Sequence, residues 1–203
     1  MAESPRRRLV LASASIFRRR MLEAAGLTFE VVPADVDEAA IKLAMLSSDA
    51  TPSAIALALS AAKAEAVSAC TPDALVIGAD QVLALGSEIF NKPAGMIEAR
   101  EQLLRLRGKT HHLHTGAALA IGGKAVWSRV EIATLAMRFF SEDFLSVYLA
   151  NVGDRVCHTV GAYEIEGPGI QMFERTEGDS FTIIGVPLLP LLAELRARGV
   201  IAA

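Results

Sequence analysis

The stretch "ALVIGADQVLAL", residues 74–85, restricts the possible folds of this chain more than any other segment. Apolar residues occupy both faces of the extended chain here, interrupted only by Gly78, Asp80 and Gln81. Strands that are apolar on both faces are typical of sheets covered by helices on both sides. The segment therefore predicts a central, buried strand of an α/β protein.

Strand and helix patterns alternate around this segment and support that class. Residues 8–13, "RLVLAS", predict a buried strand that leads into a helix ended by Gly26. Residues 28–38 predict another strand followed by an acidic loop, and Thr51-Pro52 predicts the start of a long alanine-rich helix.

The second half of the chain predicts mainly antiparallel structure. A long hairpin is expected around Gly122-Gly123, and helices are expected over about 97–106 and after Pro187. With 52% hydrophobic and 5% aromatic residues, the chain can bury one substantial aliphatic core. We expect a single domain over residues 1–203, with a mixed, elongated β-sheet flanked by helices.

Charge and cysteine usage indicate the compartment and the class of partner. The formal net charge is −3, which predicts binding to neither nucleic acid nor an anionic membrane. Cys70 and Cys157 form no CxxC pair and no disulfide framework, which favours a reducing compartment. No window approaches the ~18 consecutive apolar residues of a membrane-spanning helix. We expect a cytoplasmic protein.

Two serines and an arginine at the start of the first helix form a candidate anion site. Serine hydroxyls cap helix N-termini, and the free N–H groups there bind phosphate. Ser13, Ser15 and Arg18 are placed for this role. Alternatively, Arg18, Arg19 and Arg20 form only the solvent-exposed face of the helix. The serines have no evident base in the sequence, so capping is favoured over a nucleophilic role.

Charged residues near strand ends supply further candidate groups. Asp80, expected at the end of the buried strand, could act as a general base or a Mg²⁺ ligand, or could cap a turn. Glu38 in the acidic loop could join it. Lys92, beside Pro93, and Lys63, on the alanine-rich helix, are candidate point charges for a phosphate, or ordinary surface lysines.

Several well-known signatures are missing from the sequence. It holds no G-x-x-x-x-G-K-[ST], G-x-G-x-x-G or G-x-S-x-G pattern, as a P-loop kinase, a Rossmann dehydrogenase or an α/β-hydrolase would. His111, His112 and His114 look like a metal tract, but two of them alternate along a strand and the third faces away. No partner Cys/His pair gives a zinc spacing, so we expect no zinc site.

Short motifs in chain order resemble the Maf family of nucleoside triphosphate pyrophosphatases over about residues 9–198. They are LASASIFR, F-x-V with a following DE, AAKA, VIGAD, KP, GKTH with a following TG, GAYEIEG, and EG with a following GVPL. The resemblance implies two lobes around a nucleotide cleft, as in Maf and ITPase-like folds. It implies cleavage of a nucleoside triphosphate between its α- and β-phosphates, giving monophosphate and pyrophosphate.

The resemblance also implies a divalent cation, Mg²⁺ or Mn²⁺, held by Glu38 and Asp80, with Asp80 also accepting the proton of the attacking water. By the same resemblance, and from the aliphatic excess of the sequence, we expect a homodimer.

Roles for the other candidates follow from the same resemblance. Ser13, Ser15 and Arg18 would bind the triphosphate, while Lys92 and Lys63 would neutralise charge on the pyrophosphate leaving group. Arg19 and Arg20 would then be the solvent-exposed face of the helix.

Three positions distinguish branches of the family by the base they recognise. The branch acting on dTTP and UTP carries Arg, Thr and Gln, whereas the branch resembling 7-methyl-GTP pyrophosphatase carries an aromatic residue, Gln and Glu. Here they are Phe17, Gln81 and Glu166. An aromatic face suits the cationic 7-methylguanine ring, and a carboxylate suits the N–H donors of guanine. We therefore expect 7-methyl-GTP or another modified purine nucleotide as substrate.

Other interpretations stay open. Phe17 is alternatively a core residue at the start of the helix. The chain is alternatively a dTTP/UTP pyrophosphatase with altered recognition, or a nucleotide-binding regulator of septum formation or cell division without turnover. Nucleic-acid binding through the two RRR runs is disfavoured, because no basic face studded with aromatic residues accompanies them.

Overall fold

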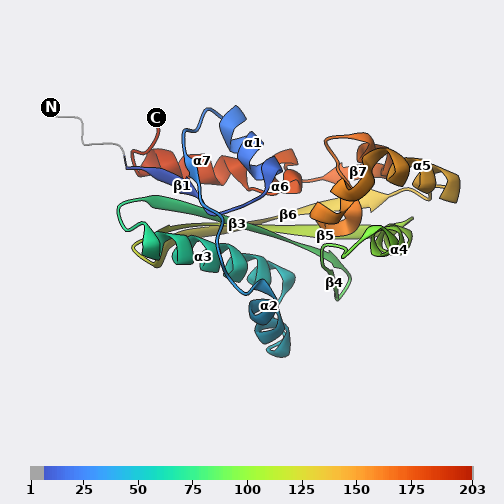
Figure 1. Cartoon of the computed structure of the whole chain (residues 1–203), viewed down its shortest axis with the longest axis horizontal. Coiled ribbons are helices and arrows are strands. Elements are labelled where there is room, and N and C mark those ends of the chain that lie inside the picture. Colours follow the sequence, from blue (N-terminus) through green and yellow to red (C-terminus); the bar gives the residue numbers. More distant parts are fainter. Residues whose placement is uncertain (1–6, 203) are drawn as a thin grey trace. The chain divides into compact units, whose positions relative to one another are not determined.

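A computed structural model describes residues 7–202 of the chain. The strands within this range are β1 (Leu9–Leu11), β2 (Glu30–Val31), β3 (Leu75–Leu85), β4 (Glu88–Phe90), β5 (Thr110–Ile121), β6 (Lys124–Met137) and β7 (Phe173–Glu177). They form one seven-stranded sheet in the order β2-β1-β3-β5-β6-β7, with β4 paired to β3 (Figure 1). β1 is parallel to β2 and β3, whereas β4 and β7 pair antiparallel with β3 and β6. The predicted α/β class with a mixed sheet is confirmed.

Helices form most of the connections between these strands. They are α1 (Ile16–Ala24), α2 (Glu38–Ser47), α3 (Pro52–Cys70), α4 (Met96–Leu106), α5 (Glu142–Val152), α6 (Ser180–Ile184) and α7 (Leu188–Ala197), with the 3₁₀ turns η1 (Gly153–His158), η2 (Val160–Ala162) and η3 (Pro168–Met172). Local side-chain capping explains where α1 and α3 begin. Thr51, for example, accepts a hydrogen bond from the N–H of Ala54 at 3.2 Å, as a helix N-cap does.

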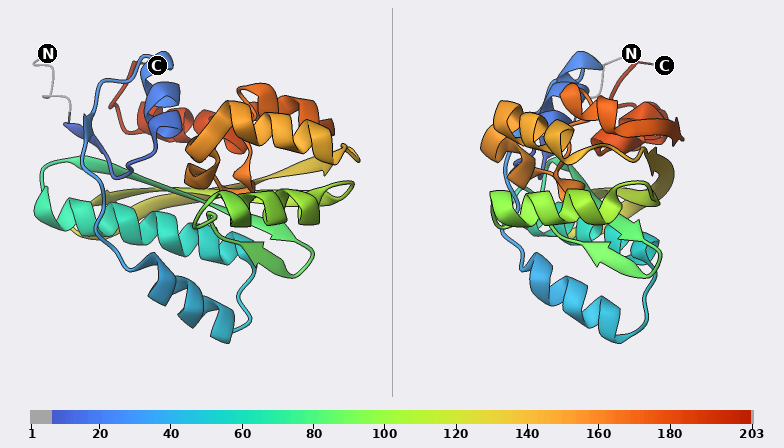
Figure 2. Two further views of the ribbon diagram at one scale, coloured as in Figure 1. Left: turned by 45° about the vertical axis from the view of Figure 1, so that its right-hand side comes forward. Right: turned by 90° about the vertical axis from the view of Figure 1, so that its right-hand side faces the viewer.

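The segment between β1 and α3 differs from the sequence expectation. The strand expected within residues 28–38 contains only the two residues of β2, and both are exposed. The acidic loop is shorter than expected, because Asp37 caps α2 and Glu38 is already its first residue. α2 has no buried residue, and it packs beside α3 on the side away from the sheet (Figure 2).

The chain divides into two compact units. The first contains the described residues up to Asp80, Thr115–Glu131 and the segment from Ser180 onward. The second contains Gln81–His114 and Ile132–Asp179. The nucleotide cleft that the family resemblance implies stays a prediction.

The core of the first unit has two layers, one on each face of its strands. Leu11 and Ile77 belong to a buried cluster that includes α1 and α7, whereas Val10 and Val76 belong to a cluster with α3. Successive residues of a strand point to opposite faces, so one sheet buries side chains on both sides. Each fully buried side chain of this size contributes about 1.5–3 kcal/mol. This arrangement explains why the first half of the segment, residues 74–79, is apolar on both faces.

Glycines bring α3 unusually close to the sheet. A Cβ atom at Gly78 would lie 2.1 Å from the carbonyl oxygen of Ser60, and one at Gly116 would lie 2.6 Å from that of Ala56. Gly78 therefore interrupts the apolar strand because a helix backbone occupies the space of its side chain. In the described part of the chain, α3 alone has the length and composition of a possible membrane span. Its contact with the glycines is that of a core helix.

Candidate functional site

The two serines after β1 build the N-terminus of α1. Ser15 is the N-cap, and its hydroxyl accepts a hydrogen bond from the N–H of Arg18 at 3.4 Å. The Ser13 hydroxyl accepts one from the N–H of Ser15 at 3.3 Å. The predicted helix cap is confirmed. The turn places the start of α1, with its free N–H groups and the positive end of the helix dipole, directly after a buried strand.

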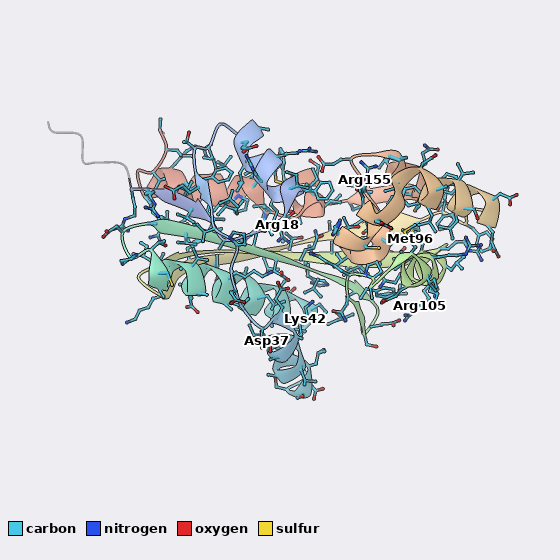
Figure 3. The ribbon with its side chains drawn as sticks, viewed as in Figure 1. Arg18, Asp37, Lys42, Met96, Arg105 and Arg155 are labelled. Carbon is cyan, nitrogen blue, oxygen red and sulfur yellow. The ribbon has the colours of Figure 1, made fainter. Side chains whose placement is uncertain are left out.

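Arg18 differs from its two neighbours in where its side chain lies. Arg18 is labelled in Figure 3. Its Nε donates to the carbonyl oxygen of Gly185 at 2.9 Å, and its Nη1 donates to the Ser13 hydroxyl at 3.2 Å. Burial lowers the pKa of Arg18, while the nearby charges of Asp80 and Glu38 raise it. An arginine keeps its charge under such conditions. Its guanidinium is therefore a fixed positive charge at the start of α1.

Arg19 and Arg20 lie on the other side of the helix. Both are exposed. The Nε of Arg19 pairs with Glu23 at 2.8 Å, one helical turn further on. The solvent-exposed face expected of Arg19 and Arg20 agrees with these positions, whereas the phosphate-binding role expected of Arg18 stays a prediction.

A lysine joins two carboxylates near Arg18. The Nζ of Lys63, on α3, is 2.5 Å from Oδ1 of Asp80 and 2.9 Å from Oε1 of Glu38. The side chains of Lys63 and Asp80 are 10% and 8% exposed, whereas Glu38 is about half-exposed, at 47%. Buried charges are tolerated in proteins when they are paired. Three elements, α2, α3 and β3, thus contribute one charged group each to the same cluster.

Asp80 lies in the middle of β3 and not at its end, contrary to the sequence expectation. β1 stops at Leu11, which pairs with Ile77, whereas β3 continues to Leu85 because β4 pairs with its second part. Asp80 is therefore beyond the last β3 residue that pairs with β1. The rule that ligands bind past the carboxyl ends of parallel strands still applies here, with β1 as the strand that ends.

The carboxylates of Glu38 and Asp80 suit a divalent cation of a particular kind. Both contact one ammonium group, Nζ of Lys63, so the two carboxylates face the same position, which this ammonium occupies in the structure. No group of three or more His, Cys, Asp or Glu residues among those the structure describes could hold a metal ion. Mg²⁺ commonly takes one or two protein carboxylates and completes its shell with phosphate oxygens and water. The donor set fits such a shared cation.

Of the remaining predicted residues, Gln81, Lys92 and Glu166 belong to the second unit and Phe17 to the first. Gln81 follows Asp80 on β3, so its side chain points to the opposite face of the sheet. Lys92 follows β4, and Glu166 lies between η2 and η3; both are exposed. Phe17, in the first unit, is half-buried at the start of α1. The roles expected for these four residues in base recognition and leaving-group stabilisation stay predictions.

The turn that contains Glu166 also contains a buried glutamate, Glu164, which the sequence did not single out. Glu164 is 9% exposed, and its backbone N–H donates to the Tyr148 hydroxyl at 3.1 Å. A Cβ at Gly169 would lie 2.5 Å from the Glu164 carbonyl oxygen, so only glycine fits there. Nη2 of Arg155 lies 3.5 Å from the Glu164 carboxylate. The motif GAYEIEG contains two glutamates, and the sequence does not distinguish them. In the structure Glu164 is buried, whereas Glu166 is exposed.

The three histidines are arranged as the strand period predicts. His112 and His114 lie on one side of β5 with ring centroids 6.3 Å apart. His111 is buried on the other side, where its Nε2 lies 2.8 Å from the Tyr163 hydroxyl.

Comparison with known proteins identifies the family. The sequence model of the family described as Maf-like protein matches residues 8–198. The chain belongs to the Maf family. The family predicted from the motifs is thus confirmed, and the match spans residues of both compact units.

Three relatives are similar to this chain over nearly their full length. A protein named 7-methyl-GTP pyrophosphatase from Mesorhizobium japonicum is 52% identical, covering 96% of this chain and 98% of the relative. One of the same name from Brucella abortus is 51% identical, covering 93% and 95%. A protein named nucleoside triphosphate pyrophosphatase from Granulibacter bethesdensis is 49% identical, covering 93% and 96%.

Proposed function

We propose that this Maf-family protein hydrolyses a nucleoside triphosphate to its monophosphate and pyrophosphate. The observation that carries the proposal is the cluster of Arg18, Lys63, Asp80 and Glu38 at the N-terminus of α1. It combines fixed positive charge for phosphates with a carboxylate able to accept a proton. The names of the pyrophosphatase relatives, at about half identity over nearly the full length, support the same activity.

The residues of the cluster have distinct roles in this proposal. Ser13, Ser15 and the free N–H groups of α1 bind phosphate oxygens together with Arg18. Water attacks the α-phosphorus, and the bond from this atom to the oxygen bridging to the β-phosphate breaks. The proton of the water passes to Asp80, on Oδ2, because Oδ1 accepts the hydrogen bond from Lys63. Monophosphate and pyrophosphate are the products.

Positive charge stabilises the group that leaves. Lys63 is next to Asp80 and neutralises negative charge that develops on the phosphates, and Lys92 has the same role in the proposal. Glu38 and Asp80 would hold Mg²⁺ or Mn²⁺. Such an ion, when bound, supplies electrostatic stabilisation of the phosphate oxygens and orients them.

The proposed substrate is 7-methyl-GTP or another modified purine nucleotide. Phe17 is half-buried and precedes Arg18 in the chain, and in this proposal its ring stacks on the cationic base. Glu166 is exposed, and its carboxylate can accept hydrogen bonds from the N–H donors of guanine, with Gln81 as a further polar contact. Uracil and thymine present two acceptors beside one donor, and a carboxylate repels acceptors. Relatives named 7-methyl-GTP pyrophosphatase support this choice.

A substrate panel tests the proposal. Pyrophosphate release is measured from 7-methyl-GTP, GTP, dTTP, UTP and CTP, first with Mg²⁺ and then with Mn²⁺. We expect kcat/KM for 7-methyl-GTP to exceed the others by more than about tenfold, or roughly 1.4 kcal/mol of transition-state binding. Glu166→Gln should reduce this preference, whereas Glu174→Gln, an exposed glutamate on β7, should not. A preference for dTTP or UTP would overturn the base-recognition argument and leave the catalytic one.

Asp80→Asn separates the enzyme from a non-catalytic regulator of septum formation. The amide keeps the shape of the side chain but cannot accept the proton, so turnover should fall about 10²- to 10⁴-fold. A cellular effect that survives this loss would favour the regulator. We further propose a homodimer in the cytoplasm that binds neither nucleic acid nor membranes; the net charge of −3 supports the last two points.

A further inference from the structure

The turn after α6 supports the side chain of Arg18. The Gly185 carbonyl oxygen accepts a hydrogen bond from Nε of Arg18 at 2.9 Å. Gly185 has φ 131°, a backbone conformation that favours glycine. A Cβ there would also lie 3.3 Å from Nε of Arg18. The backbone therefore favours glycine at this position, and a Cβ there would have to push the Arg18 side chain aside.

Hydrogen bonds attach the turn after α6 to the sheet of the first unit. The hydroxyl of Thr115, on β5, donates to the carbonyl oxygen of Thr182 at 2.8 Å, and both residues are at most 1% exposed. The N–H of Gly185 donates to the carbonyl oxygen of Phe181 at 3.0 Å, which closes the turn at the end of α6. α6 contains five residues and has little stability by itself. Its anchor on β5 therefore fixes the position of the Gly185 carbonyl.

The acceptors that hold Arg18 are both uncharged. A backbone carbonyl accepts from Nε and the Ser13 hydroxyl accepts from Nη1, and neither of these two hydrogen bonds uses Nη2. A carboxylate in either place would orient the guanidinium but would cancel its charge for a substrate. Neutral acceptors orient it without pairing with its charge, and the nearby carboxylates of Asp80 and Glu38 are themselves paired with Lys63. This arrangement is suited to a group that binds an anionic ligand.

We propose that Gly185 and Thr115 are positioning residues that orient the Arg18 guanidinium for phosphate binding. The inference rests on the proposed function, since it assigns a support to one of its phosphate-binding groups. Neither residue touches the substrate. A side chain at Gly185 displaces Arg18, and loss of the Thr115 hydroxyl releases the turn.

A double-mutant cycle in kcat/KM tests this inference. Gly185→Ala should lower kcat/KM at least tenfold, and Thr115→Val, which keeps the side-chain shape, should lower it severalfold. Gly26→Ala is the matched control: it has φ 78°, but no atom lies within 4 Å of the added Cβ. It should change kcat/KM less than twofold. In an Arg18→Ala background, both losses should disappear, because the group they position is gone.

Structural damage gives a different pattern. If Gly185→Ala or Thr115→Val lowers kcat/KM by the same factor with and without Arg18, the positioning role is overturned. Circular dichroism identifies a Gly185→Ala protein that fails to fold, in which case the Thr115→Val cycle decides.

Binding of inorganic triphosphate, measured by calorimetry in the same cycle, separates this inference from the proposed function. The positioning role is supported if Gly185→Ala weakens triphosphate binding in the wild-type background but has no such effect in the Arg18→Ala background. This holds even if no nucleotide is hydrolysed. Nucleotide hydrolysis with independent effects of the two substitutions supports the proposed function alone. A wild-type protein that neither hydrolyses nucleotides nor binds triphosphate overturns both.

Discussion

Lys63 shows how one side chain takes its properties from its surroundings. On an alanine-rich helix a lysine would ordinarily lie in water, but here its Nζ contacts Asp80 and Glu38. The glycines under α3 allow this, because the helix lies so close to β3 that the lysine reaches the strand. Removing one partner of a buried ion pair leaves the other charge uncompensated, at a cost of about 3–5 kcal/mol. The ion pair of Lys63 and Asp80 therefore stabilises the fold in addition to its proposed role in the reaction.

His111 should make the stability of the protein depend on pH. Burial lowers the pKa of His111 from 6.5 to about 4, and the charge of His112 lowers it as well. In the described structure its Nδ1 has no hydrogen-bond partner, and its Nε2 contacts the Tyr163 hydroxyl. The unfolded chain therefore binds a proton more readily than the folded chain between about pH 6.5 and pH 4.

Stability should accordingly fall as the pH falls through this window, by on the order of 3 kcal/mol in total. Urea unfolding at several pH values measures the loss. His111→Phe removes the titrating group, so its curve should be flatter than that of the wild type between pH 6.5 and 4. His158→Phe, at a histidine in η1 outside this aromatic cluster, should leave the slope unchanged. Parallel wild-type and His111→Phe curves would contradict the prediction.

At the scale of elements, α2 depends on its N-cap. It has no buried residue, and the Asp37 carboxylate accepts a hydrogen bond from the N–H of Ala40 at 2.9 Å (Figure 3). Glu38, the next residue, pairs with Lys63. A fraying first turn would therefore release a carboxylate of the proposed metal site.

Asp37→Ala should cost about 1 kcal/mol of local helix stability. Because Glu38 then loses its fixed position, we expect a severalfold higher Mg²⁺ concentration for half-maximal pyrophosphate release, with nearly unchanged kcat at saturating Mg²⁺. Ser141→Ala removes the equivalent cap of α5. The Ser141 hydroxyl accepts a hydrogen bond from the N–H of Phe144 at 3.1 Å. This control should lose comparable stability without any change in the Mg²⁺ requirement. An equal shift in both variants would refute the link between α2 and the metal.

For the whole molecule, the first unit is assembled from distant parts of the chain. Its core cluster combines Leu11 and Ile77 with Leu188, Leu191 and Leu195 of α7. The first of these α7 leucines is 3% exposed and the other two are fully buried. The unit therefore lacks a side of its core until the C-terminal helix has been synthesised.

A chain ending at Pro187 should not fold. Removing one buried leucine side chain commonly costs about 2–5 kcal/mol, and a typical protein is stabilised by only about 5–15 kcal/mol. We expect no cooperative urea transition, by circular dichroism, from the shortened chain. Leu189→Ala in the full chain changes an α7 leucine that is 61% exposed, and it should unfold much like the wild type. A cooperative transition in the shortened chain would show that α7 is dispensable.

The features that could be predicted from the sequence are those set by neighbouring residues. Thr51 and Ser15 cap helices through hydrogen bonds to residues three positions on, and a strand buried on both faces must be apolar on both. The motif order was sufficient to predict the family, because each motif is a short contiguous pattern. The extent of β2 and α2 could not be read in this way, since both are largely exposed and lack a hydrophobic period.

The site itself depends on contacts between residues far apart in the chain. The sequence placed Asp80 at a strand end, whereas pairing with β4 continues the strand, and it is the end of β1 that puts Asp80 beyond a parallel neighbour. Nothing local to Lys63 indicates its contact with Asp80, and nothing local to Arg18 indicates the carbonyl of Gly185 that holds it. Local hydrogen bonding and side-chain periodicity thus determined the elements and the family. Only the packing of those elements decided which charged groups meet, because that depends on how closely backbones approach across the sheet.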